Sequence, residues 1–60
     1  MSPEVWKNKK NGKLYRILYY SVINATNAQD GQKMVVYENM EGQIFVREQK
    51  EFYEKFEEVK

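Results

Sequence analysis

The chain has 60 residues and a formal net charge of +1, and it contains neither cysteine nor histidine. Disulfides and zinc sites built on these residues are therefore excluded, as are catalytic mechanisms that need a histidine base or a cysteine nucleophile. One domain, residues 1–60, is all that this length allows, and its core must be small. One Trp, five Tyr and three Phe remain to stabilise it. We expect an aromatic core or a homo-oligomer, no cofactor and no enzymatic activity.

The charges are spread unevenly along the chain. Residues 1–37 carry six basic and two acidic side chains, whereas residues 38–60 carry four basic and seven acidic ones. This asymmetry indicates an anionic partner for the basic half, unless the two halves neutralise each other in the fold. The longest apolar run, residues 14–23, contains Arg16 and is too short to span a bilayer. The N-terminus does not resemble a signal peptide, so we expect a soluble, cytoplasmic protein without a membrane partner.

The first two predicted strands are residues 5–8, with Trp6 pointing inward, and residues 14–25. Between them, Asn11-Gly12 predicts a hairpin with a type I′ turn, in which both residues take positive φ. The second strand is long and apolar on both faces. We expect it to bend and join two parts of one closed barrel.

A polar turn at residues 27–31 precedes strands at residues 33–38 and 43–48, which are joined at Glu41-Gly42. Alternation along these strands predicts which side chains face the core. The residues expected on the inner face of this hairpin are Val35 or Val36, Ile44 and Val46.

The tail changes its periodicity from that of a strand to that of a helix. Phe52, Phe56 and Val59 recur at i, i+4 and i+7, which predicts a short helix that closes one end of the barrel. Phe52 should cover the hairpin from this helix. Residues 57–60 are alternatively an edge strand or a frayed end. The glutamates between the apolar positions are interpreted as a solvated face, with mimicry of nucleic acid as the alternative. The predicted fold class is mainly β, a small barrel of four to five antiparallel strands with a C-terminal helix.

Four segments together resemble a family of small bacterial and phage proteins known only as a domain of unknown function. The segments are Gly12–Leu18 (GKLYRIL), Met34–Tyr37 (MVVY), Phe45–Arg47 (FVR) and Glu51–Phe56 (EFYEKF). The resemblance extends from about Trp6 to Phe56 and implies an SH3-like β-barrel. It implies no activity, cofactor or catalytic residue.

Three groups of side chains are candidates for binding a ligand or partner. They are Trp6 with Lys9, Lys10 and Arg16; the adjacent Tyr19 and Tyr20; and Tyr37, Phe45 and Arg47. The first group suits phosphates and a stacked base, although Trp6 could instead plug the barrel end. One of the two adjacent tyrosines should face solvent and stack on a ligand, unless both pack in the core. Arg47 suits a phosphate or carboxylate, or alternatively a structural ion pair or a cation–π contact with Tyr37.

The function expected from these observations is that of a small non-enzymatic binding module, encoded by a phage or mobile element, that acts on a host protein. SH3-like barrels bind many unrelated partners, so this expectation rests on analogy at the level of the fold. Two alternatives stay open. The first is sequestration of a nucleotide-derived signal in a pocket between subunits of a homo-oligomer. The second is binding of single-stranded nucleic acid by the aromatic and basic face.

Overall fold

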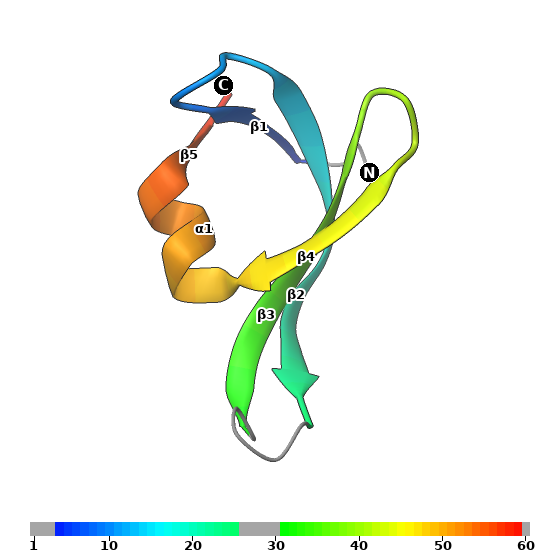
Figure 1. The fold of residues 1–60 in the computed structure, drawn as a ribbon, viewed down its shortest axis with the longest axis vertical. Coiled ribbons are helices and arrows are strands. Elements are labelled where there is room, and N and C mark those ends of the chain that lie inside the picture. Colours follow the sequence, from blue (N-terminus) through cyan, green and yellow to red (C-terminus); the bar gives the residue numbers. More distant parts are fainter. Residues whose placement is uncertain (1–3, 26–30, 60) are drawn as a thin grey trace.

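The computed structural model describes residues 4–25 and 31–59, which form strands and one short helix (Figure 1). The elements in chain order are β1 (Val5–Asn8), β2 (Leu14–Asn24), β3 (Gln32–Asn39), β4 (Ile44–Glu48), α1 (Gln49–Lys55) and β5 (Phe56–Glu58). Most of the polar turn predicted at residues 27–31 lies outside the described residues. Strands β1 to β4 begin and end within one or two residues of the positions predicted from the sequence.

The five strands form one antiparallel sheet in the order β4-β3-β2-β1-β5. The edge strands β4 and β5 are not paired with each other within the described residues, and α1 connects them (Figure 1). The helix packs against β3, β4 and β5 and so covers the open side of the curved sheet. The predicted fold class, a mainly β SH3-like barrel with a short C-terminal helix, is confirmed. The barrel is completed by the helix instead of by strand pairing.

The predicted bend in β2 is confirmed. Its pairing with β3 shifts register between Ile17 and Tyr19 and again between Tyr19 and Val22. Ser21 has a positive φ of 51°, which a non-glycine residue adopts rarely. Gln49 at the start of α1 holds this conformation, because its Oε1 accepts hydrogen bonds from the Ser21 backbone N–H at 2.9 Å and hydroxyl at 3.2 Å. Such bulges bend a strand sharply, so the second half of β2 turns away from the part of the sheet that covers the core.

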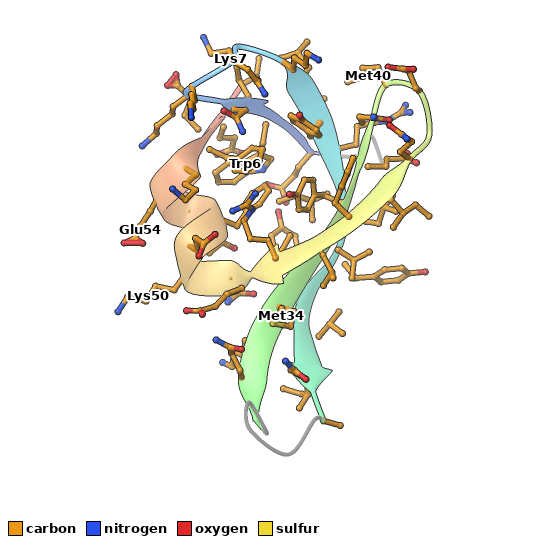
Figure 2. The ribbon with its side chains drawn as sticks, viewed as in Figure 1. Trp6, Lys7, Met34, Met40, Lys50 and Glu54 are labelled. Carbon is orange, nitrogen blue, oxygen red and sulfur yellow. The ribbon has the colours of Figure 1, made fainter. Side chains whose placement is uncertain are left out.

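The core is small and largely aromatic. Its buried side chains are Ile17, Val35, Tyr37, Phe52 and Phe56, with Trp6 and Tyr15 packed against them. Phe52 and Phe56 stack with ring centroids 4.2 Å apart, and Tyr37 lies 5.0 Å from Phe52. Figure 2 shows Trp6 in the interior between β1 and α1, where its ring centroid lies 5.4 Å from that of Phe52. The contacts confirm that Trp6 points inward and that Phe52 covers the β3–β4 hairpin.

The prediction that Ile44 and Val46 lie on the inner face of this hairpin is wrong. Ile44 is 65% exposed and Val46 60% exposed. The register pairs buried Tyr37 with Phe45 and buried Val35 with Arg47, so Phe45 and Arg47 point toward the core side of β4. Aromatic contacts decide the orientation, since the Phe45 ring stacks on Tyr37 with centroids 5.5 Å apart.

The helix ends earlier than the predicted apolar stripe. Phe56 has extended backbone angles and begins β5, which pairs with β1, so the alternative interpretation of residues 57–60 as an edge strand is confirmed for Glu57 and Glu58. Neither Phe56 nor Val59 therefore lies in the helix. Phe56 is nevertheless buried, as the apolar stripe predicts, whereas Val59 is 44% exposed, so the predicted burial of Val59 is wrong. Among the described residues, no helix has the length and apolar character needed to cross a membrane.

A candidate binding groove between two turns

A groove runs along the end of the molecule where the β1–β2 turn, the β3–β4 turn and the C-terminal end of α1 meet. Its basic end is a pocket of about 500 Å³ lined by Lys9, Lys10, Arg47, Glu54 and Lys55 together with Asn8 and Asn11. Its middle is a pocket of about 210 Å³ walled by Tyr15, Tyr37, Phe45 and Phe56. Asn8, Asn11 and Arg47 line both pockets, so the two lie side by side.

The groove continues past Tyr15 and Phe45 toward the β3–β4 turn. These two rings also line a further pocket of about 440 Å³, whose other walls include Lys13, Asn39, Met40 and Gln43. Met40 stands at the tip of the β3–β4 turn, at the same end of the molecule as Lys7 on β1 (Figure 2). The groove is therefore elongated, with a basic end, an aromatic middle and a mixed far end.

The β1–β2 turn builds one wall of the groove, and its geometry differs from the predicted type I′ turn. Gly12 has a φ of 74°, but Asn11 does not take positive φ. The connection has five residues, 9–13, and Asn8 organises it: its Oδ1 accepts hydrogen bonds from the backbone N–H groups of Lys10 at 2.8 Å and Asn11 at 3.1 Å. Asn11 acts in the same way on Lys13, at 2.8 Å. An asparagine side chain that caps its own turn replaces the tighter hairpin.

These turn bonds determine which polar group each asparagine offers to a ligand. Because Oδ1 of Asn8 and Asn11 is occupied by backbone N–H groups, the orientation of each amide is assigned by its hydrogen bonds. The remaining group on each side chain is the Nδ2 amide, which only donates. Both residues line the basic end of the groove, so the turn supplies hydrogen-bond donors beside the lysines.

Arg47 lies at the junction of the basic and aromatic parts. Its Nε–H donates to the Tyr37 hydroxyl at 3.3 Å, and its guanidinium carbon lies 5.9 Å from the Phe56 ring centroid. It also forms an ion pair with Glu51, one helical turn along the chain. The hydrogen bond with Tyr37 and the ion pair with Glu51 raise the pKa of Arg47, while burial opposes them. Arg47 thus contacts the buried side chains of Tyr37 and Phe56, and its own side chain remains 33% exposed where it lines the groove.

At the basic end, Lys10 and Lys55 are available to bind a ligand, whereas Lys9 is held by the protein. Lys9 is anchored to the helix, because its Nζ donates to the Glu54 carbonyl at 3.2 Å and its backbone N–H donates to the Lys55 carbonyl at 3.0 Å. It thereby satisfies carbonyl groups at the end of α1. Lys10 and Lys55 form no ion pair within residues 4–25 and 31–59, and both are exposed. These two ammonium groups are free to meet an anion.

The structure brings together part of the predicted site. Lys9, Lys10, Tyr37, Phe45 and Arg47 all line the groove. The other predicted residues lie elsewhere. Trp6 packs between Phe52 and Tyr53, Arg16 pairs with Glu38 at 3.3 Å across β2 and β3, and Tyr19 and Tyr20 are exposed on β2.

Asn8, Asn11, Tyr15 and Lys55 line the groove but were absent from the predicted site. Asn8 and Asn11 carry a signal that could have found them, since asparagines shortly before a glycine are typical of a side-chain-capped turn. Lys55 carries no such signal. It reaches the groove only because the β1–β2 turn contacts the end of α1, a contact between residues far apart in the chain.

Comparison with known families assigns the chain to one of them. Residues 9–60 match the family described as Protein of unknown function (DUF1653). The chain belongs to this family. The match agrees with the predicted resemblance to a family of unknown function, and it contains the whole groove apart from Asn8. No curated protein and no solved structure matches the chain significantly.

Proposed function

We propose that this member of the family is a non-enzymatic binding module that holds an acidic segment of a partner protein in the groove. The donor set at the basic end carries the proposal. Lys10 and Lys55 present ammonium groups and Asn8 and Asn11 present amides, while Glu54 is the only carboxylate that the pocket includes among the described residues. Carboxylates accept strong charge-assisted hydrogen bonds from such donors.

The shape of the groove favours an extended ligand. Three adjacent pockets lead from the basic end past the rings of Tyr15 and Phe45 to the β3–β4 turn. A peptide could place acidic side chains beside Lys10 and Lys55 and an apolar side chain against the rings. We further propose that the module is encoded by a phage or mobile element and that its partner is a host protein in the cytoplasm.

Calorimetric titration with a glutamate-rich peptide at low ionic strength tests this function. Replacing Lys10 and Lys55 together by Gln should weaken binding roughly tenfold, since each exposed ion pair contributes up to about 1 kcal/mol. The matched control replaces Lys33 on β3 and Lys50 on α1 together by Gln, because both lysines lie outside the groove and their loss removes the same two charges. Raising the salt concentration should weaken wild-type binding. Absence of binding at low salt, or equal losses in the control, would contradict the proposal.

A nucleotide is the second candidate ligand, and one observation favours it. The rings of Tyr15 and Phe45 stand beside Arg47, so a base could stack on a ring while a phosphate meets the basic end. This reading includes the sequestration of a nucleotide-derived signal. Phe45→Leu should weaken nucleotide binding and leave the acidic peptide bound. Binding of nucleotides or single-stranded oligonucleotides without binding of the peptide would replace the first proposal by the second.

A further inference from the structure

The outer face of the β2–β3–β4 sheet is apolar, and no other part of residues 4–25 and 31–59 covers it. Val35 and Tyr37 point into the core, so Val36 between them points to the opposite face. The register places Tyr19 and Val46 directly beside Val36, on either side of it. Tyr19 is 65% exposed. These three side chains form a continuous apolar row across three strands.

Neighbouring rows extend this surface, which we name the outer face. Ile44 lies two residues from Val46 on the same side of β4, and Val22 pairs with Met34 two residues from Val36. The charges at one border largely cancel, because Arg16 and Glu38 form an ion pair with each other. The face therefore presents an apolar centre of little net charge, unlike the groove.

The groove and the outer face lie on opposite sides of the sheet. Tyr15, Tyr37, Phe45 and Arg47 belong to the inner set of alternating residues, whereas Tyr19, Val36 and Val46 belong to the outer set. A partner that covers the outer face would leave the groove open.

We propose that two copies of this chain associate through their outer faces to form a symmetric dimer. The exposed fractions of Tyr19, Val22, Ile44 and Val46 correspond to roughly 500 Å² of surface per protomer, and the bordering charged residues bring the area that a dimer would bury toward the lower limit of specific interfaces. The bordering carboxylates already have partners within the protomer, Arg16 for Glu38 and the amide of Gln32 for Glu48, so a face with this apolar centre is complementary to itself, as a two-fold interface requires. Because the core is small, burying further apolar surface in a dimer would add to the stability of the fold.

The dimer has a consequence for binding, which rests on the proposed function. Two grooves would face away from the shared interface, so one dimer could engage two acidic segments of one partner. Linked segments then bind more tightly than a single one, through a raised effective concentration.

Light scattering and concentration-dependent NMR spectra of the whole chain test the dimer. The wild type should change from monomer to dimer as its concentration rises into the high micromolar range, and the shifting amide signals should belong to Tyr19, Val36, Ile44 and Val46. Val46→Lys should abolish association. Met40→Lys, a matched change at a residue that is 50% exposed in the β3–β4 turn, should leave it intact.

A second variant and a fold measurement keep this test decisive. Val46→Thr retains a β-branched side chain and should weaken association severalfold, and circular dichroism establishes that each variant is folded. A wild type that stays monomeric at millimolar concentration overturns the proposal, and so does a folded Val46→Lys variant that still dimerises. Neither result affects the titrations of the groove, so failure of the dimer and failure of the proposed function are distinguishable.

Discussion

Replacing Val35 by Ala should remove a large part of the stability of the fold. Val35 is 0% exposed in the middle of β3 and belongs to the buried core together with Ile17, Phe52 and Phe56. The substitution deletes two methyl groups, which corresponds to roughly 1.6 kcal/mol of lost transfer free energy before the cost of the cavity. We expect a loss of about 2–3 kcal/mol in the free energy of unfolding. A chain of this size has about 3–9 kcal/mol in total.

The matched control is the same substitution at Val46, which is 60% exposed on the other face of the neighbouring strand. Val46→Ala should cost less than about 0.7 kcal/mol, because most of its side chain already contacts water. Thermal unfolding followed by circular dichroism at low micromolar concentration, where a weak dimer dissociates, measures both variants. Val35→Ala should lower the midpoint by roughly 10–20 °C. A loss at Val46 equal to or larger than that at Val35 would refute the assignment of the two faces.

Three further predictions test local features of the structure. Ser21→Gly should leave stability within about 0.5 kcal/mol, whereas Ser21→Val should cost about 1–3 kcal/mol in chemical denaturation because its φ is positive. Burial, and then the charge of Glu4, raises the pKa of Tyr53 above its ordinary 10.0, so its absorbance titration should lie on the alkaline side of a free tyrosine. Since the folded state disfavours the phenolate, stability should fall as pH rises beyond the ordinary tyrosine pKa, and Glu4→Gln should reduce the shift. Asn8→Ala should cost about 1–2 kcal/mol in thermal unfolding through two lost turn bonds, whereas Asn8→Asp should keep the turn and abolish binding of an acidic peptide.

The strands were predictable because turn residues and β-branched or aromatic runs alternate clearly along the chain. The face of β4 was not predictable, because both alternation sets are apolar and one of them includes Arg47. Aliphatic Ile44 and Val46 looked like core residues by composition alone. Arg47 instead points to the core side because Tyr37 and Glu51 satisfy its guanidinium there. Tyr37 lies on another strand and leaves no local signal, and Glu51 comes within reach of Arg47 because a helix begins at Gln49.

The end of the helix was ambiguous for a related reason. Phe52 and Phe56 satisfy helical spacing, and both are buried, yet they belong to a helix and to a strand respectively. Pairing of β5 with β1 overrides the local periodicity. The candidate site was predictable in its single elements, the lysines of the turn and the aromatic residues around Arg47. That these residues and Lys55 line one groove could not be predicted, because it depends on contacts between the β1–β2 turn and the end of α1.

Two-dimensional NMR titration with a glutamate-rich peptide tests the central claim, that the groove binds an acidic ligand, most directly. The side-chain amide signals of Asn8 and Asn11 and the Nε–H signal of Arg47 should shift together along one saturating curve. The side-chain amide of Gln49, which lies at the opposite end of α1 from Lys55, should stay unchanged and serves as the internal control. Unchanged Asn8 and Asn11 signals at saturating peptide, or shifts spread evenly over all side-chain amides, would contradict the account.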